Sequence, residues 1–229
     1  MNMVLTAAMI VVPMIFAIVF HEVAHGLVAS WLGDPTASER RRLSLNPLRH
    51  VDWFGTIILP GLLFLVHAPV FGWAKPVPID YRRLHRPKRD MALVGAAGPA
   101  ANFMLAVLSA LVIRALVRVF GSADDPGVVV TTLEIFIVFN CFLGLFNLLP
   151  LPPFDGSRIL RGLLPWPAAR VLDRIEPFGI LIFALFFVIL PQIAPSLHLF
   201  DRLMRPPFTW VIAQMEAVAG IPFADFFGQ

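Results

Sequence analysis

The stretch His21-Glu22-Val23-Ala24-His25 places two histidines four residues apart, with a glutamate directly after the first. On an α-helix, residues four apart lie on the same face, so both imidazoles can bind one metal ion. Zn²⁺ accepts such nitrogen ligands at roughly 2.0–2.1 Å and, in catalytic sites, takes a third protein ligand and leaves a position for water. Glu22 can then act as the general base for that water. The motif therefore predicts a hydrolytic zinc site.

The residues around this motif are almost all apolar. Residues 1–20 carry no charge, and residues 26–33 carry none either. An ionisable side chain at the middle of a bilayer costs roughly 2.5–3.5 kcal/mol even on insertion scales. A chance match in a helix would leave Glu22 in apolar surroundings without a role, so metal ligation is the favoured interpretation.

The composition is that of a membrane protein. Of the 229 residues, 58% belong to the hydrophobic set and 14% are charged, against about 25% charged residues in soluble domains. This balance predicts a polytopic protein embedded in the lipid bilayer. The net charge of +3 does not indicate nucleic-acid binding, because the Arg and Lys residues lie between apolar spans. The single cysteine, Cys141, excludes an internal disulfide and is expected to be a small buried side chain.

Uncharged runs predict the membrane segments. They cover 1–33, Trp53–Ala74, Met91–Ile113, Ile135–Phe154 and Pro177–Phe200. All but the second are long enough to cross ~30 Å of hydrocarbon as helices of about 20 residues. The tail Arg205–Gln229 is compatible with either an interfacial helix or a final short span.

The cationic residues predict the topology. Three segments are rich in Arg and Lys: 34–52, 75–90 and 155–176. The N-terminus has none, so it is expected outside, with the three basic segments in the cytoplasm. Trp53–Ala74 has basic flanks on both sides and Pro60-Gly61 at its centre, which predicts a re-entrant hairpin. The following Gly72–Ile79 contains two prolines and is expected to be an extended edge segment.

A third metal ligand is predicted after the fourth span. In the stretch Asn147–Gly156, three prolines interrupt the helix and Asp155 follows on a loosened backbone. A solvated Asp155 that caps the next helix is an equally common arrangement. The two motifs constrain each other, because both histidines can reach Asp155 only if spans one and four run in the same direction. One full crossing between them, with Trp53–Ala74 re-entrant, satisfies that requirement.

Three motifs carry a family resemblance. They are H-E-x-x-H at 21–25, A-G-P-x-x-N at 97–102 and N-x-x-P-x-P-P-x-D-G at 147–156. Together they resemble the site-2 protease family of intramembrane zinc metalloproteases, and Gly72–Pro78 is similar to the spacer of its small prokaryotic members. The resemblance implies one Zn²⁺ held by His21, His25 and Asp155, with Glu22 as the catalytic acid/base. It also implies that Asn102 and Asn147 help hold the site or the substrate strand.

The implied fold is an all-α polytopic membrane protein. It has a three-helix catalytic core with a re-entrant segment and short extended edge strands, followed by one or two C-terminal helices. Residues 1–165 would form the metalloprotease core, and residues 166–229 the C-terminal transmembrane or interfacial helices of the same compact domain. The expected location is a prokaryotic plasma membrane, with the active site toward the cytoplasm.

The predicted function is hydrolysis of a peptide bond within or near the transmembrane segment of a membrane-protein substrate. Pairing with Gly72–Ile79 would hold the unwound substrate extended. A metal transporter or sensor would use the same ligands but give no role to Glu22, and a non-catalytic scaffold would bind no metal. His50 is expected to be a solvated loop histidine outside the ligand set.

Overall fold

The computed structural model describes residues 2–65, 72–121 and 127–223, and every regular element in these ranges is helical. Four helices there are long and apolar enough to cross a membrane: Met3–Trp31 (α1), Pro87–Phe120 (α4), Gly127–Asn147 (α5) and Trp166–Ile193, which contains α7 to α9. Helices that are hydrophobic all round are typical of membrane spans. The chain is therefore a polytopic membrane protein. The shorter α-helices are α2 (Thr36–Glu39), α3 (Leu59–Leu65), α6 (Asp155–Leu163), α7 (Trp166–Ile175), α8 (Gly179–Phe183) and α9 (Leu190–Ile193).

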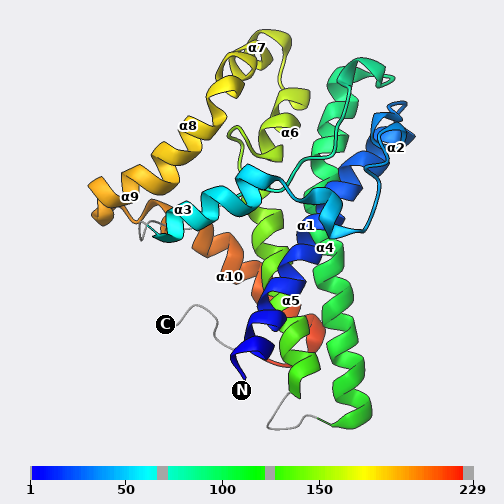
Figure 1. Ribbon diagram of the computed structural model, residues 1–229, viewed down its shortest axis with the longest axis vertical. Coiled ribbons are helices and arrows are strands. Elements are labelled where there is room, and N and C mark those ends of the chain that lie inside the picture. The colour runs from blue at the N-terminus through cyan, green and yellow to red at the C-terminus, as the bar shows by residue number, and fades with distance from the viewer. Residues whose placement is uncertain (1, 66–71, 122–126, 224–229) are drawn as a thin grey trace.

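The helices α1, α4 and α5 pack against one another at the centre of the molecule. In Figure 1, α1 rises from the N-terminus, α4 descends beside it and α5 rises again. The helices α1 and α5 therefore run in the same direction, as the two ligand motifs require. Small side chains, among them the fully buried Ala106 and Ala110 of α4, allow the helices to approach closely.

Near the C-terminus one long helix, α10, packs against α4 and α5. It spans Leu199–Ala219 and contains Pro206 and Pro207. Its buried residues join a core cluster formed by Ala106, Ala110, Ile113, Ile137, Cys141, Val211, Met215 and Ala219. The helix α10 is thus part of the packed bundle. Cys141 is fully buried in the same cluster, which confirms its expected role as a small buried side chain.

The segment Trp53–Ala74 leaves the bundle and returns to its starting point. It begins with a short π-helix at Trp53–Ile58 and continues as α3. The N–H of Trp73 donates to the Gly55 carbonyl at 3.1 Å, and the Thr56 hydroxyl donates to the Trp73 carbonyl at 2.8 Å. The two ends of the segment therefore lie side by side. Residues 66–71, between them, lie outside the described part of the chain.

The prediction of short extended edge strands is wrong. Residues 72–80 belong to no regular element, and no β-strand occurs in the described ranges. The polar groups of this segment bond to side chains and loops in place of a neighbouring strand. Arg42 Nη2, for example, donates to the Lys75 carbonyl at 2.8 Å. Pro76 and Pro78 also lack the N–H groups that a regular ladder needs.

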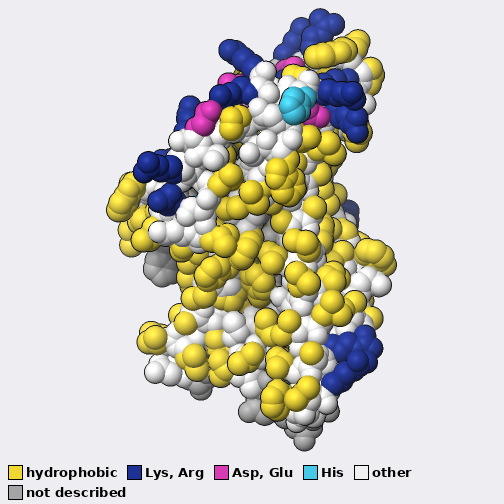
Figure 2. All heavy atoms as spheres, turned by 90° about the vertical axis from the view of Figure 1, so that its right-hand side faces the viewer, with side chains coloured by type: hydrophobic (Ala, Val, Ile, Leu, Met, Phe, Trp, Pro, Cys, Tyr) yellow, Lys and Arg dark blue, Asp and Glu magenta, His cyan; other side chains and the backbone are white. Residues whose placement is uncertain are grey.

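The surface has the polarity of a membrane protein. Figure 2 shows hydrophobic side chains in a broad band across the middle of the face that it presents. Lys and Arg side chains gather at the end that carries α2 and α7 in Figure 1, with a smaller group at the opposite end. An apolar band between charged ends matches a protein surrounded by lipid.

Candidate metal centre

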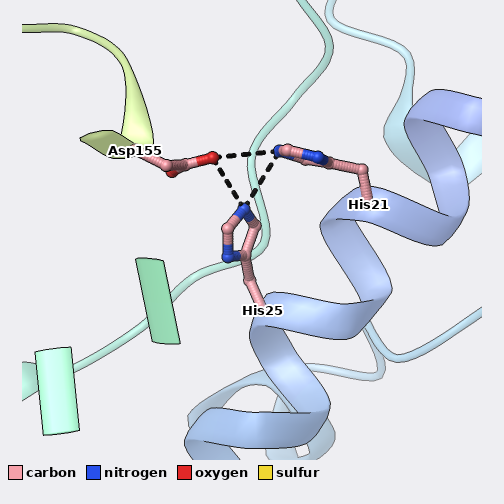
Figure 3. Close-up of side chains that lie close together, drawn as sticks. All are labelled: His21, His25 and Asp155. Carbon is pink, nitrogen blue, oxygen red and sulfur yellow. Dashed lines mark hydrogen bonds and ion pairs between the residues drawn. The ribbon is translucent and has the colours of Figure 1, made fainter. Parts of the chain in front are cut away.

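His21 and His25 lie on one face of α1, and their side chains point at each other with the Nε2 atoms 3.1 Å apart. Asp155 is the first residue of α6 and joins them from the other side of the site (Figure 3). Its Oδ2 lies 3.0 Å from His21 Nε2 and 3.1 Å from His25 Nε2. All three residues are buried, with exposed fractions of 5%, 3% and 4%. The alternative of a solvated Asp155 capping the next helix is therefore wrong.

The hydrogen bonds of the two Nδ1 atoms determine which nitrogen of each imidazole presents a lone pair to the centre. His21 Nδ1 lies 2.6 Å from Asn102 Oδ1, and His25 Nδ1 lies 2.7 Å from the Val94 carbonyl oxygen. Both of these oxygens can only accept, so each Nδ1 carries the proton and donates it. In the neutral rings each Nε2 is then an unprotonated ligand atom.

The three converging atoms fit a metal ion. Two imidazole lone pairs and a carboxylate oxygen lie 3.0–3.1 Å apart with no hydrogen between them, an arrangement that a cation stabilises. Ligands at roughly 2.0–2.1 Å from a tetrahedral Zn²⁺ would lie about 3.3 Å from one another.

Helix α4 leaves room for this centre at Gly98. A Cβ atom at this position would lie 2.5 Å from His21 Cε1 and 2.7 Å from His21 Nε2. Real Cβ atoms essentially never come so close to another heavy atom. The absence of a side chain at Gly98 therefore provides the space that both rings and an ion need.

Arg158 belongs to the site although the motifs did not identify it. It lies three residues after Asp155 on α6, and its Nη1 donates to Asp155 Oδ1 at 2.9 Å. This contact occupies Oδ1 and leaves Oδ2 for the histidines. The i, i+3 spacing is the signal that could have identified it, but in the sequence Arg158 is one of several cations in a basic segment.

Glu22 contacts the segment 72–80, which belongs to no helix or strand. It is half-buried, and its Oε2 accepts a hydrogen bond from the N–H of Val77 at 2.8 Å. The segment expected to hold a substrate is therefore tied directly to the glutamate beside the metal centre.

Of the two asparagines expected to support the site, only Asn102 contacts a member of the cluster. Asn102 reaches the cluster through His21, whereas Asn147 donates to the Leu143 carbonyl of its own helix at 3.0 Å.

The expectation of a solvated His50 is wrong, because this side chain is only 3% exposed and its Nε2 donates to the Ser44 carbonyl at 2.8 Å. His50 lies outside the group formed by His21, His25 and Asp155.

Comparisons with known proteins agree with this site. The family model described as Peptidase family M50 matches residues 112–190. The Bacillus subtilis protein named "Putative zinc metalloprotease YwhC" is 37% identical over 183 residues, which are 78% of this chain and 80% of that protein. "Putative zinc metalloprotease Rip2" of Mycolicibacterium smegmatis is 31% identical over 193 residues, covering 83% of this chain and 68% of the relative.

A third relative comes from an archaeon. "Putative zinc metalloprotease MJ0611" of Methanocaldococcus jannaschii is 32% identical over 144 residues, which are 62% of this chain and 64% of that protein. No solved structure matches the chain. The extent of the YwhC match, together with the matched family model, establishes the relationship. The chain belongs to peptidase family M50, the site-2 protease family of zinc metallopeptidases.

Proposed function

We propose that this chain is an intramembrane zinc metalloprotease that hydrolyses a peptide bond within or near the transmembrane segment of a membrane-protein substrate. The observation that carries the proposal is the convergence of His21 Nε2, His25 Nε2 and Asp155 Oδ2 within 3.1 Å, inside a bundle of membrane-length helices. These three atoms would hold one Zn²⁺ per chain and leave a coordination position for the reaction.

Each residue of the site has a defined task in this proposal. When bound, Zn²⁺ supplies a Lewis acid that polarises the scissile carbonyl and makes water more acidic. Glu22 takes the proton of the attacking water as general base and later delivers it to the leaving amine. The hydrogen bond from Val77 orients the Glu22 carboxylate through Oε2 and leaves Oε1 for the proton. Asn102 holds the His21 ring, and Arg158 holds the Asp155 carboxylate.

The proposed substrate is a transmembrane helix that unwinds locally at the site. A helix hides its carbonyl groups in internal hydrogen bonds, so the scissile segment must become extended before it reacts. Residues 72–80 form no helix, and the Val77 N–H donates to Glu22 Oε2. A substrate strand bound along this segment would lie beside the general base. We assign to Asn147, half-buried at the end of α5, a supporting contact with this strand.

We assign the N-terminus to the outside and the active site to the cytoplasmic side of a prokaryotic plasma membrane. The concentration of Lys and Arg at the end with α2 and α7 supports this orientation (Figure 2). The hydrogen bond between Trp73 and Gly55 supports a re-entrant hairpin that does not cross the bilayer. In this assignment residues 1–165 form the protease core. Residues 166–229 add the C-terminal helices to the same domain, supported by the packing of α10 on α4 and α5.

A metal transporter or sensor is the competing function, because a buried three-ligand cluster can also bind a metal without hydrolysis. The two differ in the role of Glu22. Comparative membrane proteomics of cells that express either the wild type or Glu22→Gln separates them. The protease predicts that specific single-pass membrane proteins accumulate uncleaved in the variant. An unchanged set of membrane proteins, with altered cellular metal content, would favour the transporter.

A further inference from the structure

Asn140 of α5 is fully buried in the bundle, although it belongs to none of the three motifs. Its Nδ2 donates to the Phe136 carbonyl, one turn earlier in the same helix, at 2.8 Å. A carbonyl can only accept, so the NH₂ end of the Asn140 amide must face Phe136. The orientation of this amide is therefore determined, with Oδ1 presented to the neighbouring helix.

The next contact fixes a second amide. Asn140 Oδ1 accepts a hydrogen bond from Asn102 Nδ2 of α4 at 2.8 Å. The same NH₂ group donates to the Ala17 carbonyl of α1 at 3.2 Å. Both N–H bonds of Asn102 are thus used, and its Oδ1 faces His21 Nδ1 at 2.6 Å. If the Asn102 amide were turned by 180°, its carbonyl would face two other acceptors, so the observed orientation is strongly favoured.

We infer that Asn140 is a positioning residue for the metal centre and acts through Asn102 on His21. Its hydrogen bond to Phe136 orients Asn140, Asn140 orients Asn102, and Asn102 holds the proton of His21 on Nδ1. Each donor in this series determines the next acceptor, and the series ends with His21 Nε2 free to bind a metal. The inference rests on the proposed function, because it takes His21 as a ligand. It also means that one set of contacts joins α1, α4 and α5 and aligns the ligand.

The variant Asn140→Leu tests this series because leucine has a similar size but can neither donate nor accept. Asn102 then keeps only the Ala17 carbonyl as an anchor, and His21 spends more time with its proton on Nε2. Substitution of residues just outside a metal's ligand shell typically weakens metal binding 10–100-fold, so for a residue one step further out we expect about a tenfold loss.

Three further variants keep the test independent of folding. Asn140→Asp retains an acceptor for Asn102 and should bind Zn²⁺ with an affinity between those of the wild type and Asn140→Leu. If Asn140→Leu does not fold, Asn140→Ser serves in its place, because its hydroxyl is too short to reach Asn102 and can still bond its own helix. Ile137→Ala is the matched control, since Ile137 is fully buried on the same helix but takes no part in the series. It should lower thermal stability and leave Zn²⁺ affinity unchanged.

The experiment measures Zn²⁺ binding to the purified full-length chain in detergent by competition with a chelating dye. A ¹⁵N spectrum of the metal-free, ¹⁵N-histidine-labelled protein reports in parallel which ring nitrogen of His21 carries the proton. Weaker Zn²⁺ binding and more Nε2-protonated His21 in Asn140→Leu, but not in Ile137→Ala, would support the inference. Equal affinities and equal spectra for Asn140→Leu and the wild type would overturn it and leave the proposed function standing. A wild-type chain that binds no Zn²⁺ would overturn both.

Discussion

His21 Nε2 and Asp155 Oδ2 lie 3.0 Å apart although 134 residues separate them in the chain. The contact exists because α1 and α5 run in the same direction, with α4 returning between them (Figure 1). Asp155 follows shortly after the end of α5 and opens α6 at the depth of the histidines.

Removing the charge of Asp155 should empty the metal centre. Asp155→Asn keeps the shape of the side chain but replaces a carboxylate ligand by a weaker amide oxygen. We expect a loss of Zn²⁺ affinity larger than the 10–100-fold typical of residues outside the ligand shell, measured as zinc per chain by elemental analysis. Asp173→Asn, whose carboxylate pairs with Arg161, is the control and should keep its zinc. Full zinc occupancy in Asp155→Asn would exclude Asp155 as a ligand.

Arg158 should matter because it occupies the second oxygen of Asp155. Arg158→Gln removes the charged donor, so the carboxylate can rotate and bind the ion less well. We expect Zn²⁺ affinity to fall 10–100-fold with the helical content unchanged. Chelator competition measures the affinity, with Arg170→Gln, an exposed cation on α7, as control. Equal affinities for the two variants would mean that the ion pair of Arg158 with Asp155 contributes as little as an ordinary surface pair.

A methyl group at Gly98 should block the centre. In Gly98→Ala the new Cβ would overlap both histidine rings, and α4 is held on both sides by α1 and α5. We expect a folded chain, judged by circular dichroism, that neither retains zinc nor cleaves substrate. Gly61→Ala is the control, because a Cβ at Gly61 meets nothing within 4 Å. Wild-type zinc binding by Gly98→Ala is incompatible with the geometry described above.

The hairpin at Trp53–Ala74 predicts a labelling pattern. Single cysteines at the exposed positions Leu45 and Arg82, in a Cys141→Ser background, flank the hairpin on its two sides. Both should react with a membrane-impermeant maleimide from the same side of the membrane, because the segment between them returns without crossing. A cysteine at Val128, beyond the crossing by α4, should react from the opposite side. Labelling of Leu45 and Arg82 positions from opposite sides would reverse the assigned helix order.

The residues that meet at the site could be predicted because their spacing follows simple periods. The four-residue step from His21 to His25 is one helical turn, and uncharged runs of about 20 residues indicate spans. The packing of α10 could not be predicted in this way, since Arg205 and two prolines interrupt its apolar residues. The burial of His50 depends on how its loop folds against residues distant in sequence. Asn140 is a lone amide in an apolar helix, and only the contacts with Asn102 distinguish it from a packing residue.

The central claim is that this site hydrolyses peptide bonds with Glu22 as the proton carrier. Glu22→Gln keeps the size of the side chain and its hydrogen bond with Val77 but removes the base. The most direct measurement compares zinc content and cleavage rate of the wild type and Glu22→Gln, both purified in detergent, on a tagged transmembrane substrate. We predict that the variant retains its zinc and that its cleavage rate falls by about 10²–10⁴-fold. A variant that retains zinc and still cleaves at a near wild-type rate would contradict the mechanism.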